Sequence, residues 1–487
     1  MRMRSSDRIL RILPALALAA GVGACAVNPA TGERQLSFVS EAREIEMGRE
    51  YDRQIVAEMG LYPDPELQAY VQALGSRLAA KSERPDLPWT FRVVDDPVVN
   101  AFALPGGFIY VTRGILAHLD SEAELAAVLG HEIGHVTARH SVNQMSRSML
   151  AQLGLGAAAV FSPTVAEYSQ VAGAALGLLF LKYGRDDERQ SDDLGLRYMR
   201  AAGYDPREMA GVFAMLGRVS AASGGGRTPE WLSTHPDPAN RYERISAQVA
   251  ALPQDFAGTT VGRDAYIRRL DGLVYGDDPR QGFFRDGAFL HPELRFRLRF
   301  PEGWQTSNQR QAVLAASPAE DAMLQLTLVE AADPRSAARA FAAQDGIRAD
   351  APSRRRINGL PAVTLSFTAA AQDGSVLAGA ATFIEHGGRI YRILGYTPRG
   401  RWAAYEEAIA RTARSFRELD DPDVLRVEPW RIEVVRLERA MTVEAFARRY
   451  PGPVDAERLA LINGVEPGTR FEAGRLVKRV VGEALSS

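Results

Sequence analysis

Cysteine is almost absent from this chain. Cys25 is the only one among 487 residues. A disulfide bond within the chain is therefore excluded, and so is a catalytic or structural thiol at any other position. Any reactive centre must be built from other side chains.

A long apolar run is also missing after the N-terminal segment. Residues 150–181 are rich in glycine and alanine, and the longest uninterrupted apolar stretch there runs from Val171 to Leu181. That stretch is about half the length of a helix that spans a bilayer. We expect a core helix in this segment; the alternative is a helix that dips into a membrane.

Neither sign of charge dominates the chain. The formal net charge is −2, charged residues make up 24% and hydrophobic residues 46%. This composition is typical of an ordinary soluble globular protein, and it predicts no binding to nucleic acid and no attraction to an anionic membrane surface. No repeat of 30–50 residues is present, which excludes a solenoid.

The first residues have the layout of a secretory signal. Leu13 to Ala20 form a short apolar run, and small residues follow it up to Cys25. Four arginines form a basic segment before or at the run: Arg2, Arg4, Arg8 and Arg11. We therefore expect residues 1–24 to be a signal peptide that is removed.

The end of that segment, Val22-Gly-Ala-Cys25, resembles the lipobox of bacterial lipoproteins. The resemblance implies a lipid on Cys25, a membrane anchor, and a lipidated, extended tether over residues 25–40. Ala26 follows the cysteine, as in lipoproteins sent to the outer membrane. The expected location is the periplasm, with a lipid anchor in the outer membrane. The alternative is a stray cysteine after an ordinary signal peptide.

The clearest helix in the sequence follows Ser121. Ser121 is a suitable N-cap, and Glu124 lies three residues on, which is the spacing of a capping box. Apolar residues then recur at helical spacing, which predicts one buried face: Leu125, Val128, Leu129, Ile133 and Val136.

This helix carries the pattern HExxH, as His131-Glu132-Ile-Gly-His135. Because the two histidines are four residues apart, their imidazoles project from one helical face and can share a metal ion. Glu132 lies about 100° around the helix, where it can act as the general base on a water molecule. The pattern predicts one zinc ion per chain. The alternative is a helix that carries these residues by chance.

A catalytic zinc needs a third protein ligand and an open position. His140 lies about 140° away from the metal-binding face, so it is a poor candidate. The metzincin pattern HExxHxxGxxH is absent, because Ala138 stands at its glycine position and no third histidine is in register. Glu188, on the next polar helix, is the better candidate, and Asp192 one turn later would orient a ligand histidine. Taken alone, those two acids would be an ordinary solvated pair.

Five stretches resemble the HtpX/BepA-like branch of the CAAX-prenyl-endopeptidase metallopeptidases. They are Asn100-Ala-Phe-Ala-Leu-Pro-Gly-Gly107, His131-Glu-Ile-Gly-His-Val136, Tyr183-Gly-Arg-Asp-Asp-Glu-Arg-Gln-Ser-Asp192, Ala202-Gly-Tyr-Asp-Pro206 and Ser233-Thr-His-Pro236. The resemblance covers roughly residues 35–250. It implies a gluzincin fold in which His131, His135 and Glu188 bind zinc and Glu132 is the base. Ser191 departs from the family, which usually has alanine there.

The same resemblance implies two further roles. The strand around Phe102 and Ala103, or the one at Ile109 to Val111, would hold an extended polypeptide substrate by main-chain hydrogen bonds. His235 would approach the metal, either to stabilise the oxyanion of the tetrahedral intermediate or to occupy the open position as a latch. The alternative for His235 is a surface histidine.

The expected fold class is multidomain: a mainly α-helical gluzincin-type metallopeptidase domain with a small sheet, a small α+β domain, and a short C-terminal α/β module. The expected boundaries are residues 41–255, 285–420 and 430–480. The second domain has no recognisable chemistry. The third resembles LysM modules at Leu461-Ile-Asn-Gly464 and Gly474-Arg-Leu-Val-Lys478, which implies contact with peptidoglycan. The helical repeats of the BepA-like members are absent.

Together these features predict a zinc-dependent endopeptidase of the bacterial cell envelope that cleaves misfolded or misassembled envelope proteins. Two alternatives remain open. One is a non-proteolytic or latent chaperone or scaffold whose zinc site is structural or latched by His235, although a structural site has no use for Glu132 as a base. The other is a hydrolase of peptidoglycan cross-links.

Overall fold

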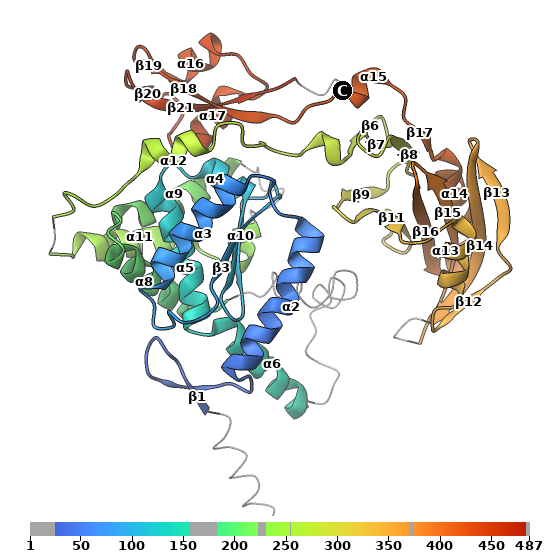
Figure 1. Ribbon diagram of the computed structural model, residues 1–487, viewed down its shortest axis with the longest axis horizontal. Coiled ribbons are helices and arrows are strands. Elements are labelled where there is room, and N and C mark those ends of the chain that lie inside the picture. Colours follow the sequence, from blue (N-terminus) through green and yellow to red (C-terminus); the bar gives the residue numbers. More distant parts are fainter. Residues whose placement is uncertain (1–24, 156–182, 223–229, 254, 371–373, 484–487) are drawn as a thin grey trace, which may run out of the picture. The chain divides into compact units, whose positions relative to one another are not determined.

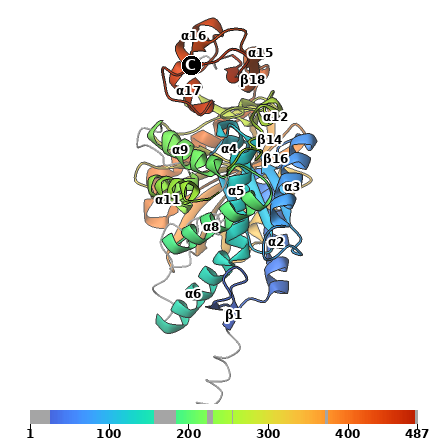
Figure 2. The same cartoon turned by 90° about the vertical axis from the view of Figure 1, so that its left-hand side faces the viewer.

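The computed structural model describes residues 25–155, 183–222, 230–253, 255–370 and 374–483 (Figures 1 and 2). The chain divides into two compact units. The first is Met1–Gly276 with Arg431–Val481, and the second is Asp277–Trp430 with Gly482–Ser487. Helices and several sheets in more than one compact part agree with a multidomain protein. Nearly all of the segment 430–480, which the sequence predicts as a separate module, groups with the first unit.

Two expected features lie outside the described residues: the signal segment 1–24 and the apolar stretch Val171–Leu181. In the part of the chain that the structure describes, no helix is both long enough and apolar enough to cross a membrane.

Two helices open the body of the first unit. Helix α2 (Glu41–Met59) begins after Ser40, whose side chain accepts a hydrogen bond from the backbone N–H of Arg43. Helix α3 (Pro65–Ala79) begins after Asp64, which caps the N–H of Leu67 in the same way. Both starts are locally encoded, because a short polar side chain satisfies an N–H group that the helix leaves unpaired.

A three-stranded sheet supports the first unit. Its strands are β3 (Thr90–Val94), β4 (Ala101–Leu104) and β5 (Phe108–Thr112). The order is β3-β5-β4, with β5 parallel to β3 and antiparallel to β4. The tight turn between β4 and β5 uses Gly106 and Gly107 at φ values of 80° and 99°, a conformation that only glycine adopts readily. Strand β5 is therefore paired on both sides, and β4 lies at an edge.

Helix α5 (Glu122–Thr137) lies at the centre of the first unit, in contact with α3, α8, α9 and β4 (Figures 1 and 2). Ser121 caps it as predicted, accepting from the N–H of Glu124 at 3.0 Å. The second hydrogen bond of the predicted capping box is wrong. Glu124 Oε2 accepts from the N–H of Asp120 at 2.5 Å, and not from the N–H of the cap residue Ser121. Every residue after Glu124 is buried. The small residues between the large apolar ones let other elements cover all faces.

Further helices complete this unit. They are α4 (Arg113–His118), α6 (His140–Leu155), α8 (Arg185–Ala201), α9 (Arg207–Ala222), α10 (Glu230–Thr234), α11 (Pro238–Ala250) and α12 (Arg263–Arg269).

The segment after Cys25 is a hairpin and not an extended tether. Strand β1 (Cys25–Val27) pairs antiparallel with β2 (Arg34–Leu36). The chain then attaches to the first unit: the N–H of Phe38 donates to Ser146 Oγ at 3.2 Å, and Arg139 donates to the carbonyl of Val39 at 2.6 Å. Its polar backbone groups thus find partners within the fold, which an extended solvated tether would not provide.

The C-terminal part of the first unit consists of two helices between two long strands. Strand β18 (Arg431–Arg436) pairs antiparallel with β21 (Leu476–Val481). Between them lie β19 (Met441–Thr442), α16 (Val443–Arg449), α17 (Ala456–Ile462) and β20 (Arg470–Phe471). Lys478, on β21, is fully buried and donates to the carbonyls of Ala117 and Leu119 at 3.1 and 2.7 Å. This buried ammonium group explains why the segment belongs to the first unit.

The second unit contains two antiparallel sheets. The larger has the order β12-β14-β15-β16-β11-β10-β9, with β13 also paired to β14, and the smaller has the order β17-β8-β7-β6. The strands are β6 (Phe283–Arg285), β7 (Ala288–His291), β8 (Phe296–Arg299), β9 (Gln305–Asn308), β10 (Ala312–Ala316), β11 (Met323–Val329), β12 (Ile347–Ala349), β13 (Ser353–Ile357), β14 (Leu360–Ala370), β15 (Val376–His386), β16 (Arg389–Pro398) and β17 (Arg417–Glu418). Its helices are α13 (Pro334–Ala342), α14 (Trp402–Ser415) and α15 (Pro422–Leu425). Side chains from both sheets and α14 form one apolar core.

Candidate metal centre

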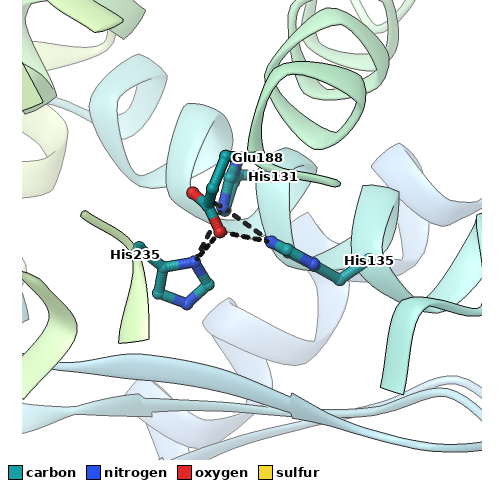
Figure 3. Close-up of side chains that lie close together, drawn as sticks. All are labelled: His131, His135, Glu188 and His235. Carbon is teal, nitrogen blue, oxygen red and sulfur yellow. Dashed lines mark hydrogen bonds and ion pairs between the residues drawn. The ribbon is translucent and has the colours of Figure 1, made fainter. Parts of the chain in front are cut away.

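Four side chains that can bind a metal converge in the first unit (Figure 3). His131 and His135 come from α5, Glu188 comes from α8, and His235 directly follows α10. One ligand atom from each lies within 4.8 Å of the other three. The structure therefore brings together all four residues that the sequence predicts around the metal.

The spacing within this cluster suits one tetrahedral ion. His131 Nε2 lies 3.0 Å from His135 Nε2 and 3.6 Å from Glu188 Oε2. Glu188 Oε1 lies 3.5 Å from His135 Nε2 and 2.8 Å from His235 Nδ1, and this Nδ1 lies 3.3 Å from His131 Nε2. Ligand atoms at about 2.0–2.1 Å from a tetrahedral zinc are about 3.3 Å apart. The side chains present therefore fit a zinc ion.

Asp192 orients His131. Its Oδ1 lies 3.0 Å from His131 Nδ1, so Nδ1–H donates to the carboxylate and Nε2 faces the cluster. Arg241 and Arg244 hold Asp192 by ion pairs of 2.5 and 3.0 Å. Burial would raise the pKa of Asp192, but Arg241 and His131 keep it below its usual range. Burial also lowers the pKa of His131 to about 3, which favours the neutral ring that binds metals.

Glu188 is kept ionised despite its burial. Arg241 Nη1 lies 2.8 Å from Glu188 Oε2. Burial would raise the pKa of Glu188, but His235 and Arg241 lower it well below the usual value. A carboxylate in this state is a ready metal ligand, and it would also partly neutralise a bound cation.

His140 does not belong to the four residues, as its angle on the helix predicts. It lies instead behind His135, with 3.0 Å between the two Nδ1 atoms. Burial lowers the pKa of His140 to about 4, so its ring is neutral near pH 7. This contact was missed by sequence reasoning, which considered His140 only as a ligand.

Glu132 faces the cluster but is not part of it. Both of its carboxylate oxygens are buried without a hydrogen bond among the described residues, and Oε1 lies 3.7 Å from His235 Nε2. Burial raises the pKa of Glu132 to about 7. A carboxylate with a pKa near the working pH is suited to accept and return a proton.

His235 is buried and held in place by an aromatic side chain. Its ring stacks on Trp231 with 4.7 Å between the centroids, and only 1% of the residue is exposed. The alternative of a surface histidine is therefore wrong. Its Nδ1 stands at the fourth corner of the ligand set, which is the position that a catalytic zinc leaves open. This is the position that the latch prediction requires.

Arg241 was missed by sequence reasoning, although the sequence contains a signal for it. Arg241 precedes Ile245 by four residues and Val249 by eight, and all three are buried on α11. Helical periodicity alone would have placed an arginine on the buried face. A buried guanidinium needs acidic partners, and here these are Glu188 and Asp192.

Close approach of α5 and α8 sets the distance between the ligands. A Cβ atom at Gly134 would lie 2.9 Å from the backbone of Ser191, and one at Gly195 would lie 2.8 Å from the backbone nitrogen of His131. These glycines let the helices touch through their main chains. Ser191 is itself small enough for this contact, which accounts for its place where the resembled family has alanine.

The two predicted substrate strands differ in what they can bind. In the sheet that the structure describes, β4 is an edge strand, so its main chain can pair with an added strand. The alternative at Ile109 to Val111 is wrong, because β5 is paired on both sides. Phe102 is itself buried and stacks on Tyr110 at 4.8 Å, so its ring is part of the core. Any role for Phe102 and Ala103 in substrate binding therefore belongs to their backbone.

Comparison with known proteins gives the family of this region. Residues 65–249 match the model of peptidase family M48, and this range contains the HExxH helix, Glu188 and His235. The chain is 30% identical over 245 residues to the β-barrel assembly-enhancing protease of Yersinia pestis. The matched region covers 47% of this chain and 50% of that protein.

Two mitochondrial proteins are also similar. The chain is 37% identical over 171 residues to the mitochondrial metalloendopeptidase OMA1 of Arabidopsis thaliana, covering 34% of this chain and 33% of that protein. It is 32% identical over 224 residues to OMA1 of Schizosaccharomyces pombe, covering 45% and 64%. The chain spans about half the length of the β-barrel assembly-enhancing proteases that it matches. Residues 65–249 are thus a peptidase family M48 domain, which confirms the metallopeptidase resemblance of its motifs.

Proposed function

We propose that this chain is a zinc-dependent endopeptidase whose metal centre is closed at rest. One observation carries the proposal: the ligand atoms of His131, His135 and Glu188 lie at the mutual distances of one tetrahedral ion, beside the carboxylate of Glu132, which forms no hydrogen bond with the part of the chain that the structure describes. A purely structural metal site would not need that carboxylate.

Each residue of the site has its own role in the proposed reaction. Zinc at this site would supply a Lewis acid that polarises the scissile carbonyl and activates a water. Glu132 accepts the proton of the attacking water and delivers it to the leaving amine. Asp192 holds His131 in the tautomer that leaves Nε2 for the metal. The edge of β4 holds the extended substrate by main-chain hydrogen bonds.

His235 acts as the latch. Its Nδ1 contacts Glu188 at 2.8 Å, and its Nε2 lies 3.7 Å from Glu132, so it stands where the water and the substrate carbonyl would have to be. The four residues of the cluster and Glu132 are each at most 3% exposed. His235 must therefore move before a polypeptide can be cut, and the resting protein is latent.

Casein cleavage by the chain from Ala26 onward tests the proposal, with zinc content measured for each variant. We expect little cleavage by the wild type, cleavage by His235→Ala that a chelator abolishes, and none by the double variant His235→Ala with Glu132→Gln. Cleavage by the wild type at the rate of His235→Ala would remove the latch but keep the enzyme. If no form cleaves casein although each binds one zinc, the alternative of a non-proteolytic chaperone or scaffold is favoured. The closed centre is also compatible with that alternative.

The substrate and location proposed here rest on the relatives and on the N-terminal sequence. Because the curated bacterial relatives are named as enhancing β-barrel assembly, we propose misassembled envelope polypeptides as substrates. Cys25 would carry the lipid that anchors the chain to the outer membrane. Mass spectrometry of the N-terminal peptide from the membrane fraction checks this, because an unmodified Cys25 there would contradict the anchor.

A contact between residues 430–480 and peptidoglycan remains a proposal. Two helices between the paired strands β18 and β21 support it, together with the LysM-like stretches. Co-sedimentation of the full chain with purified sacculi would test it. Recovery of the chain in the supernatant at all sacculus concentrations would exclude this contact.

A further inference from the structure

A line of polar groups runs from the metal centre to the N-terminal hairpin. Behind His135, the Nδ1 atom of His140 lies 3.0 Å from His135 Nδ1. The other ring nitrogen of His140 lies 2.8 Å from Gln190 Oε1, on α8. Asn28, in the β1–β2 turn, places its Nδ2 3.4 Å from the same Gln190 oxygen. His140 and Asn28 are buried, and the line lies behind His135, on the side of its Nδ1.

A backbone group sets the direction of every hydrogen bond in this line. The N–H of Ala30 donates to Asn28 Oδ1 at 2.9 Å, and a backbone N–H can only donate. Asn28 therefore presents its Nδ2–H₂ group to Gln190, and Gln190 presents its oxygen. His140 Nε2 must then carry a hydrogen in order to donate to that oxygen.

The consequence reaches the metal ligand. A neutral imidazole that donates through Nε2 accepts through Nδ1. Ser191 Oγ also lies 3.3 Å from the Nδ1 of His140, and it can only be a second donor to that nitrogen. His135 Nδ1 must therefore carry the hydrogen that joins the two rings, because two unprotonated nitrogens at 3.0 Å would repel each other. Its Nε2 is left with a free lone pair, and this is the atom that faces His131 Nε2 at 3.0 Å. The line thus selects the tautomer of His135 that can bind a metal.

We propose that His140, Gln190 and Asn28 are positioning residues of the metal centre, and that the hairpin after Cys25 completes the support of His135. The part of this proposal that concerns metal binding rests on the proposed function. The part that concerns the tautomer of His135 is independent of that function. None of the three residues touches the reacting atoms. Each acts through the ring of His135.

The two ligand histidines are then supported in different ways. His131 donates to a carboxylate that two arginines hold. His135 donates to the ring of His140, whose Nε2 lies 2.8 Å from the amide oxygen of Gln190 and 3.6 Å from Asp187 Oδ1. The direct partner of His135 Nδ1 is therefore a ring, whereas the direct partner of His131 Nδ1 is a carboxylate. The support of His135 also depends on a segment more than 100 residues away in sequence, so moving the hairpin would loosen one ligand and leave the other in place.

The test uses the full chain and two measurements. Zinc affinity is measured by competition with a chromophoric chelator, and the ring nitrogens are assigned by ¹⁵N NMR of the metal-free, histidine-labelled protein, which has only 7 histidines. His140→Phe keeps a ring but removes the acceptor. We expect the dissociation constant of zinc to rise about 10–100-fold, the usual cost of removing a hydrogen-bond partner of a ligand. We also expect His135 to lose its single Nδ1–H tautomer.

Three further variants sharpen the result. His140→Asn keeps an acceptor near the Nδ1 position and should restore most of the zinc affinity. Asn28→Ala should raise the zinc dissociation constant a few-fold, about 2–5, because it removes a long hydrogen bond two steps from the ligand. His118→Phe is the matched control. His118 is also buried in the first unit, but within the described ranges its one hydrogen bond goes to the carbonyl of Gly114, so the variant should leave zinc affinity unchanged.

The outcomes separate this inference from the proposed function. If His140→Phe binds zinc like the wild type and His135 keeps its Nδ1–H tautomer, the inference is overturned, whatever the protein cleaves. If His140→Phe does not fold, Asn28→Ala decides, and unchanged zinc affinity there removes the hairpin from the site. If wild-type protein binds no zinc but shows the Nδ1–H tautomer of His135 that His140→Phe abolishes, the proposed function fails and the positioning of His135 stands.

Discussion

The two ends of helix α5 can be compared directly, since both carry buried polar side chains. At the C-terminal end are His131, Glu132 and His135. At the N-terminal end the preceding Asp120 lies beside Glu124 and the fully buried Lys478. Burial raises the pKa of Glu124 and lowers the pKa of Lys478, so each end contains groups whose ionisation is displaced by desolvation.

The ends differ in whether their carboxylates have hydrogen-bond partners. At the N-terminal end, Asp120 accepts from Arg263 at 2.9 Å and Arg475 at 3.4 Å, and Lys478 donates to two carbonyls. At the C-terminal end, neither oxygen of Glu132 has a hydrogen-bond partner among the described residues, and the Nε2 atoms of His131 and His135 lie 3.0 Å apart. Buried charge alone therefore does not identify a reactive site. A reactive site is identified instead by lone pairs that converge on one point, where only a cation can satisfy them.

The largest expected effect is on Glu132. In a chain that carries His235→Ala, Glu132→Gln should lower casein cleavage by about 10²–10⁴-fold, because the general base is lost, while zinc content stays near one per chain. Glu124→Gln, at the other end of the same helix, is the matched control and should retain cleavage. A loss of cleavage in both variants would mean that the two ends are not distinct in function.

The second effect concerns Lys478. Lys478→Met should lower the free energy of unfolding of the first unit by about 3–5 kcal/mol, because Asp120 and two carbonyls lose a buried partner. Urea unfolding measures this. Arg479→Met changes the next residue, whose ion pair with the half-exposed Glu433 is worth under about 1 kcal/mol. Equal destabilisation by both would contradict a special role for the buried ammonium group.

The third effect concerns the contact between α5 and α8. Gly134→Ala places a methyl group 2.9 Å from the backbone of Ser191 and should cost about 1–3 kcal/mol of stability, with weaker zinc binding as the helices separate. Gly217→Ala, on α9, meets nothing within 4 Å and should be neutral or stabilising. Thermal unfolding with zinc titration compares them, and identical behaviour of the two variants would exclude the close contact.

The smallest effect is a pH dependence at the N-terminal end. Burial lowers the pKa of His118 from 6.5 to about 4. As the pH falls, the unfolded chain binds a proton at His118 before the folded chain does. The contribution of neutral His118 to the free energy of unfolding is therefore complete above pH 6.5, and it is lost as the pH falls toward 4. Between pH 7 and pH 5 the wild type should lose about 2 kcal/mol more stability than His118→Phe. Parallel urea midpoints for the two proteins over this range would contradict a neutral buried His118.

Local sequence determined the elements of this protein more completely than their arrangement. Ser121 and the apolar spacing after it predict α5, because capping and periodicity are interactions within one helix. The HExxH pattern predicts that His131 and His135 share a face for the same reason. Glu188 was a candidate only because it lies on the next polar helix and in a family-like motif, since no local rule joins it to residues 53 and 57 positions earlier.

Only the tertiary structure decided what surrounds those elements. His235 at the fourth corner, Arg241 between two acids, and His140 behind His135 all depend on the packing of separate helices. The hairpin after Cys25 and the C-terminal segment with Lys478 join the first unit through hydrogen bonds to distant residues. A sequence states which groups must be satisfied when buried, but their partners are set by which helices and strands come together, and that depends on contacts distant in the chain.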